Sequence, residues 1–84
     1  MSSWLRCSLE PGMLPGEYAI ETQTAEGRTV SLFASEDQVK ADEGLVRVEV
    51  LENGRDAALV RLPSPALEVS SRTVTVPSSA VVKV

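Results

Sequence analysis

The sequence LVRVEVLENGRDAALVRLP, residues 45–63, decides the fold of this chain. Apolar and polar residues alternate in both halves of it, which is the period-two pattern of half-buried β-strands. The halves are separated by Glu52-Asn53-Gly54-Arg55, and Asn-Gly between two such runs is the strongest short-range signal of a β-hairpin. Residues 45–63 therefore predict a hairpin, around which the rest of the chain is built.

The register of this hairpin follows from which side chains must share a face. If Glu52–Gly54 form a three-residue loop whose glycine takes the left-handed conformation of a G1 bulge, Val46 pairs with Val60 and Val48 with Ala58. A one-residue shift would turn every side chain to the wrong face, so the apolar pattern selects this register. The opposite, half-polar face then carries Leu45, Arg47, Glu49, Leu51, Leu59 and Arg61.

Length and composition indicate one small all-β domain. Eighty-four residues suit a single domain, residues 1–84, with room for one thin core. The chain has 12 valines and three aromatic residues, a balance that favours strands over a helical bundle. We therefore expect an all-β barrel or roll of about six to seven short strands.

Charge is distributed unevenly along the chain. The net charge is −4, with no histidine, so no overall field attracts nucleic acid or an anionic membrane. Residues 1–43 carry eight acids against three bases, whereas residues 44–84 carry four acids against five bases. The acidic first half is therefore the expected solubilising surface.

The cysteine count and the start of the chain point to a compartment. One cysteine, Cys7, excludes an internal disulfide, and a small domain without disulfides is typical of a reducing environment. The chain starts without a basic region followed by an apolar run, and its apolar runs are far shorter than the ~18 residues of a membrane helix. We therefore expect a cytoplasmic protein with no membrane partner.

A second hairpin is predicted in the first half. Residues 4–9 alternate as a first strand, and residues 17–24 and 28–34 form the two arms around Ala25-Glu26-Gly27. Glycine again stands third in a three-residue loop. The resulting register pairs Thr22 with Val30, Ile20 with Leu32 and Tyr18 with Ala34.

Two Pro-Gly pairs, at residues 11–12 and 15–16, are consecutive signals for type II turns. They hold Met13 and Leu14 between them in a stiff loop. Exposed apolar loop residues usually find cover, so the favoured interpretation is that both side chains plug the end of the barrel. The alternative is a contact patch that they form with Trp4.

Residues 35–38, Ser-Glu-Asp-Gln, have the form of a helix start, with a serine N-cap and glutamine at the capping-box position. Few apolar residues follow, so we expect at most one short helical turn near residues 36–41, or an ordered loop. The acids of this segment lack the alternating spacing and central glycine of a calcium loop, which indicates a solvated connection.

The C-terminal third predicts shorter elements. Pro63-Ser64-Pro65 is expected to end the strand before it. Leu67 and Val69 then suggest a short strand that turns at Ser70-Ser71. Residues 72–76 predict a clearer strand, residues 77–80 a single 3₁₀ turn and residues 81–84 a closing strand.

The sequence VPSSAVVKV, residues 76–84, resembles the end of an SH3-like barrel, where a strand meets a Pro-Ser-containing 3₁₀ turn and a last short strand seals the barrel. The resemblance covers this tail and the hairpin before it, and it implies the architecture of a small SH3-like barrel. The paired Trp and Tyr-rich first strand of peptide-binding SH3 domains are missing, so it does not imply binding of Pro-rich peptides. An OB-like barrel or a two-sheet roll stays open.

No pattern in the chain is typical of catalysis. Without histidine, Cys7 has no such base to activate it, and the sequence places no base beside Ser78 or Ser79. Gly-rich phosphate loops are missing, and one cysteine without histidine excludes a Cys/His metal site. We therefore expect no enzymatic activity, no cofactor and no metal.

The main functional hypothesis is a protein-interaction or self-assembly module. Arginine beside apolar anchors suits the centre of an interface, and the leucines of residues 45–63 have no place on the valine face. The candidate surface comprises Leu45, Arg47, Leu51, Leu59 and Arg61, extended by Met13, Leu14 and Trp4. Alternatively, the hairpin of residues 17–34 covers this face as a second layer of the core.

Two further hypotheses remain. Nucleic-acid binding would use Arg47, Arg55, Arg61 and Arg72 as phosphate contacts. The acidic balance and the scarcity of aromatic residues argue against it, and the arginines can instead pair with acids on neighbouring strands. A purely structural subunit of a larger complex is the third hypothesis, which the sequence does not separate from the first.

Overall fold

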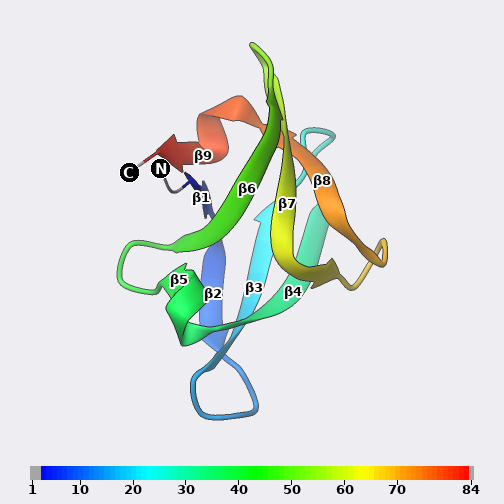
Figure 1. Ribbon diagram of the computed structural model, residues 1–84. Coiled ribbons are helices and arrows are strands. Elements are labelled where there is room, and N and C mark those ends of the chain that lie inside the picture. Colours follow the sequence, from blue (N-terminus) through cyan, green and yellow to red (C-terminus); the bar gives the residue numbers. More distant parts are fainter. Residues whose placement is uncertain (1–2, 84) are drawn as a thin grey trace.

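The computed structural model describes residues 3–83, which form nine short strands and two 3₁₀ turns (Figure 1). The elements are β1 (Ser3–Arg6), β2 (Ser8–Pro11), β3 (Glu17–Gln23), β4 (Thr29–Ser35), η1 (Glu36–Gln38), β5 (Val39–Lys40), β6 (Leu45–Asn53), β7 (Ala57–Ala66), β8 (Ser71–Pro77), η2 (Ser78–Ala80) and β9 (Val81–Lys83). The all-β prediction is confirmed. The nine strands exceed the six or seven that were expected. One reason is that the predicted first strand is divided at Cys7, and another is that residues 39–40 form the short strand β5.

The strands described in residues 3–83 form two antiparallel sheets. The larger sheet has the order β8-β7-β6-β1-β9, with β5 also paired to β6, and the smaller sheet has the order β2-β3-β4. Because β2 follows β1 directly, the chain passes from the larger sheet to the smaller one within its first ten residues. Figure 1 shows β6 and β7 in front of β3 and β4, with both termini at one edge, where β9 pairs with β1.

The core lies between the two sheets and draws on both. Its largest fully buried side chains are Leu5, Ile20, Leu32, Leu62, Val30, Val46, Val60 and Val76. All of them belong to one cluster of buried residues. Removal of this apolar surface from water is the main favourable term in folding, so it holds the two sheets face to face.

The hairpin β3–β4 has the predicted register. Thr22 pairs with Val30, and the same register continues through the other two predicted pairs. Gly27 has a φ of +85°, the left-handed conformation that a residue without Cβ adopts at low cost. This prediction succeeded because the loop and the alternation of both arms are local in the sequence.

The predicted register of the hairpin β6–β7 is wrong. Val50, and not Val46, lies opposite Val60, and a bulge follows at Leu51. Gly54 is not among the glycines with positive φ; its amide donates to the carbonyl of Ala57 at 2.9 Å. The turn of the hairpin therefore lies further along the chain than predicted, between Asn53 and Ala57.

The first half of β6 pairs with β1 and β5 and not with β7. Val46 lies opposite Leu5 of β1 on one side and opposite Val39 of β5 on the other. These partners come from distant parts of the chain, so the pattern within residues 45–63 does not reveal them. The valines of β6 still face the core as predicted, since alternation depends only on the strand itself.

The prediction that Pro63-Ser64-Pro65 ends its strand is also wrong, because β7 continues to Ala66. The ladder between β7 and β8 is interrupted instead: Arg61 pairs with Thr73, and the next pair is Ala66 with Ser71. Proline has no amide hydrogen to donate. Both prolines thus fall in the one stretch of β7 where the ladder to β8 is open.

The short strand predicted at Leu67 and Val69 is a turn. Its ends are joined by a hydrogen bond from the Ser70 amide to the Ala66 carbonyl at 2.8 Å. Ser70 has a φ of +53°, a conformation that costs a residue with a side chain about 1 kcal/mol or more. The chain therefore turns sharply between β7 and β8 and exposes both apolar side chains.

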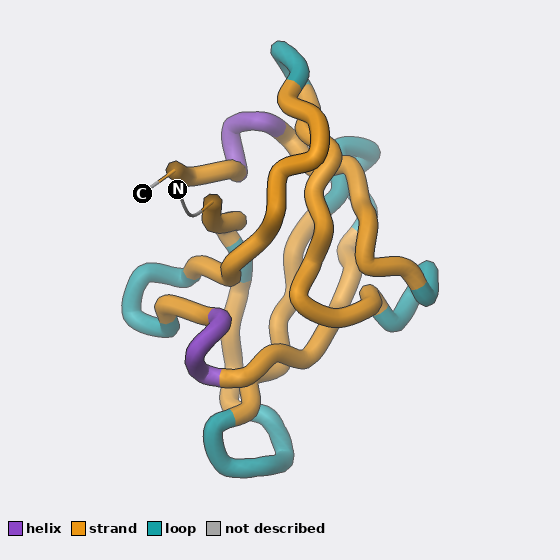
Figure 2. The backbone as a smooth tube through the Cα atoms, in the orientation of Figure 1, coloured by secondary structure: helices purple, strands orange, loops and turns teal. Residues whose placement is uncertain are grey.

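The turn predicted at residues 15–16 is confirmed. Gly16 has a φ of +77°, and the Glu17 amide donates to the Leu14 carbonyl at 3.1 Å. The turn predicted at residues 11–12 is wrong: Gly12 does not have a positive φ, and its amide extends the ladder by bonding to the Glu17 carbonyl at 2.7 Å. The loop therefore projects beyond the smaller sheet (Figure 2).

The predicted short elements are confirmed. Figure 2 shows one 3₁₀ turn before β5 and another before β9. At the first, the Ser35 amide donates to Gln38 Oε1 at 3.2 Å, as in a capping box. The closing strand pairs with β1 over residues 81–83, while Val84 lies outside the described residues.

In the described part of the chain, no helix has the length and apolar character needed to span a membrane.

Replacing Leu62 by alanine should destabilise the fold by about 2–5 kcal/mol, because truncating a fully buried side chain leaves a cavity. Leu67→Ala is the matched control: Leu67 is exposed, so we expect a loss below about 0.5 kcal/mol. Urea denaturation followed by circular dichroism measures both free energies of unfolding. Equal losses in the two variants would contradict this position of the core.

Candidate interaction surfaces

Trp4, a predicted contact residue, is buried and thus withdrawn from partners. Its side chain is 5% exposed. Lys40 Nζ lies 4.7 Å from the ring centroid and Arg47 Cζ lies 5.3 Å from it, within the range of cation–π attraction. Within residues 3–83 the indole N–H has no hydrogen-bond partner. Trp4 and its two cations therefore form a cover on the outer side of the larger sheet.

Leu45 is buried in the same region, so its prediction as an exposed contact is wrong. It lies opposite Arg6 of β1 and opposite Lys40 of β5. The alternative, in which the hairpin of residues 17–34 covers this face, does not hold for Leu45 either, because its paired neighbours belong to β1 and β5.

The other two predicted leucines are more exposed than Leu45. Leu51 is 37% exposed and stands at the bulge of β6. Leu59 is partly buried and lies opposite Glu52. Of the three predicted leucines, Leu51 and in part Leu59 thus stay accessible, whereas Leu45 does not.

Three of the four predicted arginines come together. Arg47, Arg61 and Arg72 line one hollow of about 220 Å³ on the larger sheet. Arg55 is not part of that lining and stands at the exposed tip of the β6–β7 hairpin. The arginines therefore form a local basic site, without the line of contacts that tracks a nucleic-acid backbone.

A surface that the sequence reasoning missed lies on the outer side of the smaller sheet. Phe33 is 42% exposed and points away from the core, because its neighbours Leu32 and Ala34 are buried. It lies opposite Ala19 of β3. We name this surface the Phe33 face; its apolar residues are Leu14, Ala19, Phe33 and Leu67.

The end of β7 is docked onto β4, which fixes Leu67 beside Phe33. The Leu67 amide donates to the Ser31 carbonyl at 2.8 Å. Ser64 Oγ donates to the Phe33 carbonyl. Glu68 accepts from the Ser31 amide at 2.6 Å and from Ser31 Oγ at 2.8 Å. Leu67, which is 61% exposed, is thus anchored by its own amide and by the side chains of Ser64 and Glu68 on either side of it.

Two hollows flank Phe33. One, of about 240 Å³, also contacts Ala19 and Leu67. The other, of about 280 Å³, also contacts Leu14. Acidic residues stand in both linings, namely Glu10 and Glu21 in the first and Glu17 in the second. The Phe33 face is therefore an apolar strip with an acidic border.

Met13 and Leu14 are exposed by 93% and 65%, so the prediction that they plug the barrel is wrong. The loop that carries them projects from the end of the smaller sheet, where the core is already closed. Leu14 lines a hollow together with Phe33. The predicted contact role of Leu14 thus keeps a structural basis, although Trp4 is not its neighbour in that hollow.

One sequence signal could have revealed the Phe33 face. The register of the β3–β4 hairpin was predicted correctly, and it turns residues 29, 31, 33 and 35 of β4 outward. Among them Phe33 alone is apolar. A single exposed aromatic residue is common on protein surfaces, so the signal gains meaning only when Leu14 and Leu67 are found beside it.

Cys7 does not have the features of a reactive thiol. Burial raises its pKa to about 11, so it stays protonated at neutral pH and is a poor nucleophile. Its Sγ lies 3.7 Å from the Gly44 carbonyl oxygen. In residues 3–83, no three His, Cys, Asp or Glu side chains are grouped so that they could hold a metal ion.

Comparison with protein-family models, curated proteins and solved structures finds no match for this chain.

The Glu68 contact predicts a pH dependence. Hydrogen bonds from the Ser31 amide and hydroxyl lower the pKa of Glu68, so folding favours its ionised form. This stabilisation is present above the ordinary pKa of glutamate and is lost as the pH falls through the lowered value. Glu68→Gln should therefore lower Tm at pH 7, and the difference from wild type should shrink on acidification.

Thermal unfolding by circular dichroism at several pH values measures this difference. Glu26→Gln is the control, because it removes the same charge at the exposed tip of the β3–β4 hairpin. A difference for Glu68→Gln that stays constant from pH 7 to strongly acidic pH would contradict the assignment.

Proposed function

We propose that this protein is a non-catalytic protein-interaction module and that the Phe33 face is its contact surface. The observation that carries this proposal is the exposure of Phe33, on β4, and Leu67, in the turn after β7, which line one hollow. Contiguous apolar patches on a protein surface mark interaction sites. An aromatic residue between two hollows has the form of an interface hot spot, since partner side chains can fill the hollows.

The acidic border defines the chemistry of the partner. Glu10, Glu17 and Glu21 surround the apolar strip, so a segment with lysine or arginine beside apolar side chains complements it. Charges at the rim steer association and exclude partners of the same sign, while the apolar centre supplies most of the affinity. We therefore infer a basic partner segment with two or more apolar anchors.

Self-assembly through two copies of the Phe33 face is less favourable. A two-fold contact would bring the same surface together, and the acids of the two copies would repel each other. A different protein with a basic surface avoids this cost.

The non-catalytic assignment draws on the chemistry of the chain. It lacks histidine, and burial raises the pKa of the Cys7 thiol well above neutrality.

An SH3-like arrangement of the strands and a cytoplasmic location also belong to this proposal. An unpaired cysteine suits a reducing compartment.

The proposal can be tested with defined peptides. A ¹⁵N-labelled sample is titrated with a peptide in which leucine alternates with lysine, and with a counterpart in which glutamate replaces lysine. We expect the basic peptide to shift amide resonances of β3, β4 and residue 67, and the acidic one to leave them unchanged. Phe33→Ser should weaken binding at least about tenfold, which is ~1.4 kcal/mol.

Leu51→Ser is the matched control, because Leu51 is similarly exposed but belongs to the larger sheet. It should leave the affinity unchanged. Equal weakening by both substitutions, or resonance shifts confined to the larger sheet, would refute the Phe33 face as the contact surface.

A further inference from the structure

A second possible site is the hollow lined by Arg47, Arg61 and Arg72, which lies where β6 changes its pairing partner. On one edge β6 pairs with β5 through residues 45–46 and with β7 from residue 49 onward. Residues 47 and 48 have no paired residue on that edge among the described strands. The hollow of about 220 Å³ occupies this gap, and Val48, Leu62 and Pro63 contribute its apolar walls.

The main chain of Arg47 faces the edge of β6 that pairs with β5 and β7. The Gly44 carbonyl accepts from the Cys7 amide at 2.9 Å and therefore points toward the β1 side. In an antiparallel strand the N–H and C=O groups of alternate residues point to alternate edges. Residues 44, 46 and 48 thus bond toward β1, and the main chain of Arg47 faces the opposite edge, where the register with β5 places Gln38 opposite it. Its guanidinium group lies over the Trp4 ring.

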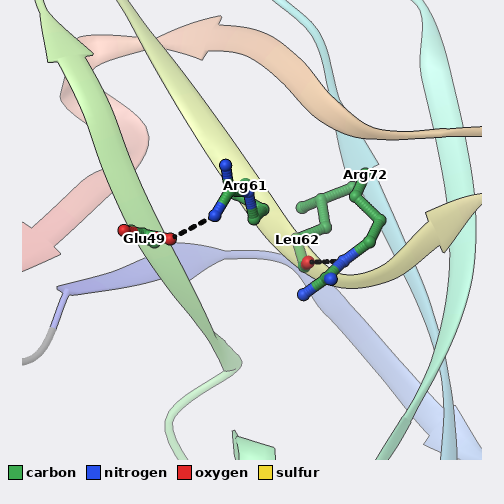
Figure 3. Close-up of polar contacts among 4 residues, drawn as sticks. All are labelled: Glu49, Arg61, Leu62 and Arg72. Atoms are coloured by element: carbon green, nitrogen blue, oxygen red, sulfur yellow. Dashed lines mark hydrogen bonds and ion pairs between the residues drawn. The ribbon is translucent and has the colours of Figure 1, made fainter.

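Arg72 is held in place by a carbonyl that the broken ladder leaves free. Its Nε donates to the Leu62 carbonyl at 3.0 Å, in the stretch where β7 and β8 are not paired (Figure 3). This bond fixes the guanidinium plane and leaves its terminal amino groups available. A fixed guanidinium is suited to bidentate recognition of a carboxylate or phosphate.

Arg61 is held by a weaker contact. Its Nη1 donates to Glu49 Oε1 at 3.0 Å, and the side chains are 46% and 62% exposed. Figure 3 shows Glu49 approaching Arg61 from β6, while Arg72 of β8 bonds to Leu62, the next residue of β7. An exposed pair of this kind contributes little to stability, so an incoming anion can compete with Glu49 for Arg61.

We propose that this hollow binds a single carboxylate from an acidic, otherwise apolar protein segment. Arg61 and Arg72 would share its oxygens, and the apolar walls accept the neighbouring aliphatic groups. Nucleic acid fits less well, because the net charge of the chain is −4 and because Trp4 is buried and offers no stacking surface.

The experiment uses ¹⁵N-labelled protein and three probes: a heptapeptide with one glutamate among valine and alanine, the same peptide with glutamine, and a single-stranded oligonucleotide. We expect the glutamate peptide alone to shift the Nε–Hε resonances of Arg61 and Arg72. Stronger binding of the oligonucleotide, or equal binding of the glutamine peptide, would overturn the proposal.

Three variants separate binding in the hollow from a response to net charge. Arg61→Gln should weaken binding of the glutamate peptide about tenfold, since it removes a charge-assisted hydrogen bond. Glu49→Gln should strengthen binding about twofold, because it removes the competing carboxylate. Arg55→Gln, at the hairpin tip, should leave binding unchanged. Equal loss in Arg61→Gln and Arg55→Gln would show a response to net charge alone and overturn the site.

Discussion

The larger sheet depends on β6, the strand within residues 3–83 that pairs with three others. One edge binds β1, and the other binds β5 and then β7. Because the side chains of a strand alternate, β6 presents its valines to the core and Arg47 and Glu49 to the outside whatever its partners are. The partner strands determine which main-chain groups of β6 are hydrogen-bonded and where a gap in the pairing remains.

The gap has chemical consequences on both of its sides. β5 is only two residues long, and the two prolines of β7 prevent a continuous ladder with β8. Pairing is thus lost on β6 and on β7 near the same point, and Arg72 satisfies one of the freed carbonyl groups. A buried carbonyl without a partner would cost about 1–3 kcal/mol, so the arginine has a structural role as well as a free donor edge.

The sequence allowed prediction of the parts of the fold that depend on local pattern. The β3–β4 hairpin, the capping contact at Ser35 and the 3₁₀ turn before β9 follow from short stretches. The register of β6 did not, because β1 and β5 compete for it from positions distant in the sequence. The same limit applies to the surfaces. Trp4 resembled a contact residue until its cover by Lys40 and Arg47 was known. Phe33 could be placed outside from the predicted register, but its neighbour Leu67 comes from a distant part of the chain that the sequence does not place beside it.

The two candidate sites meet at Gln38, which lines both the hollow beside Leu14 and Phe33 and the hollow of the arginines. Their charges are opposite, because the smaller sheet comes from the acidic half of the chain and β6–β8 from the half with excess base. A segment that reaches both would need basic residues at one end and a carboxylate at the other. If the segment lay in the reverse direction, like charges would meet at both sites. The charge pattern therefore fixes the direction in which such a segment can lie.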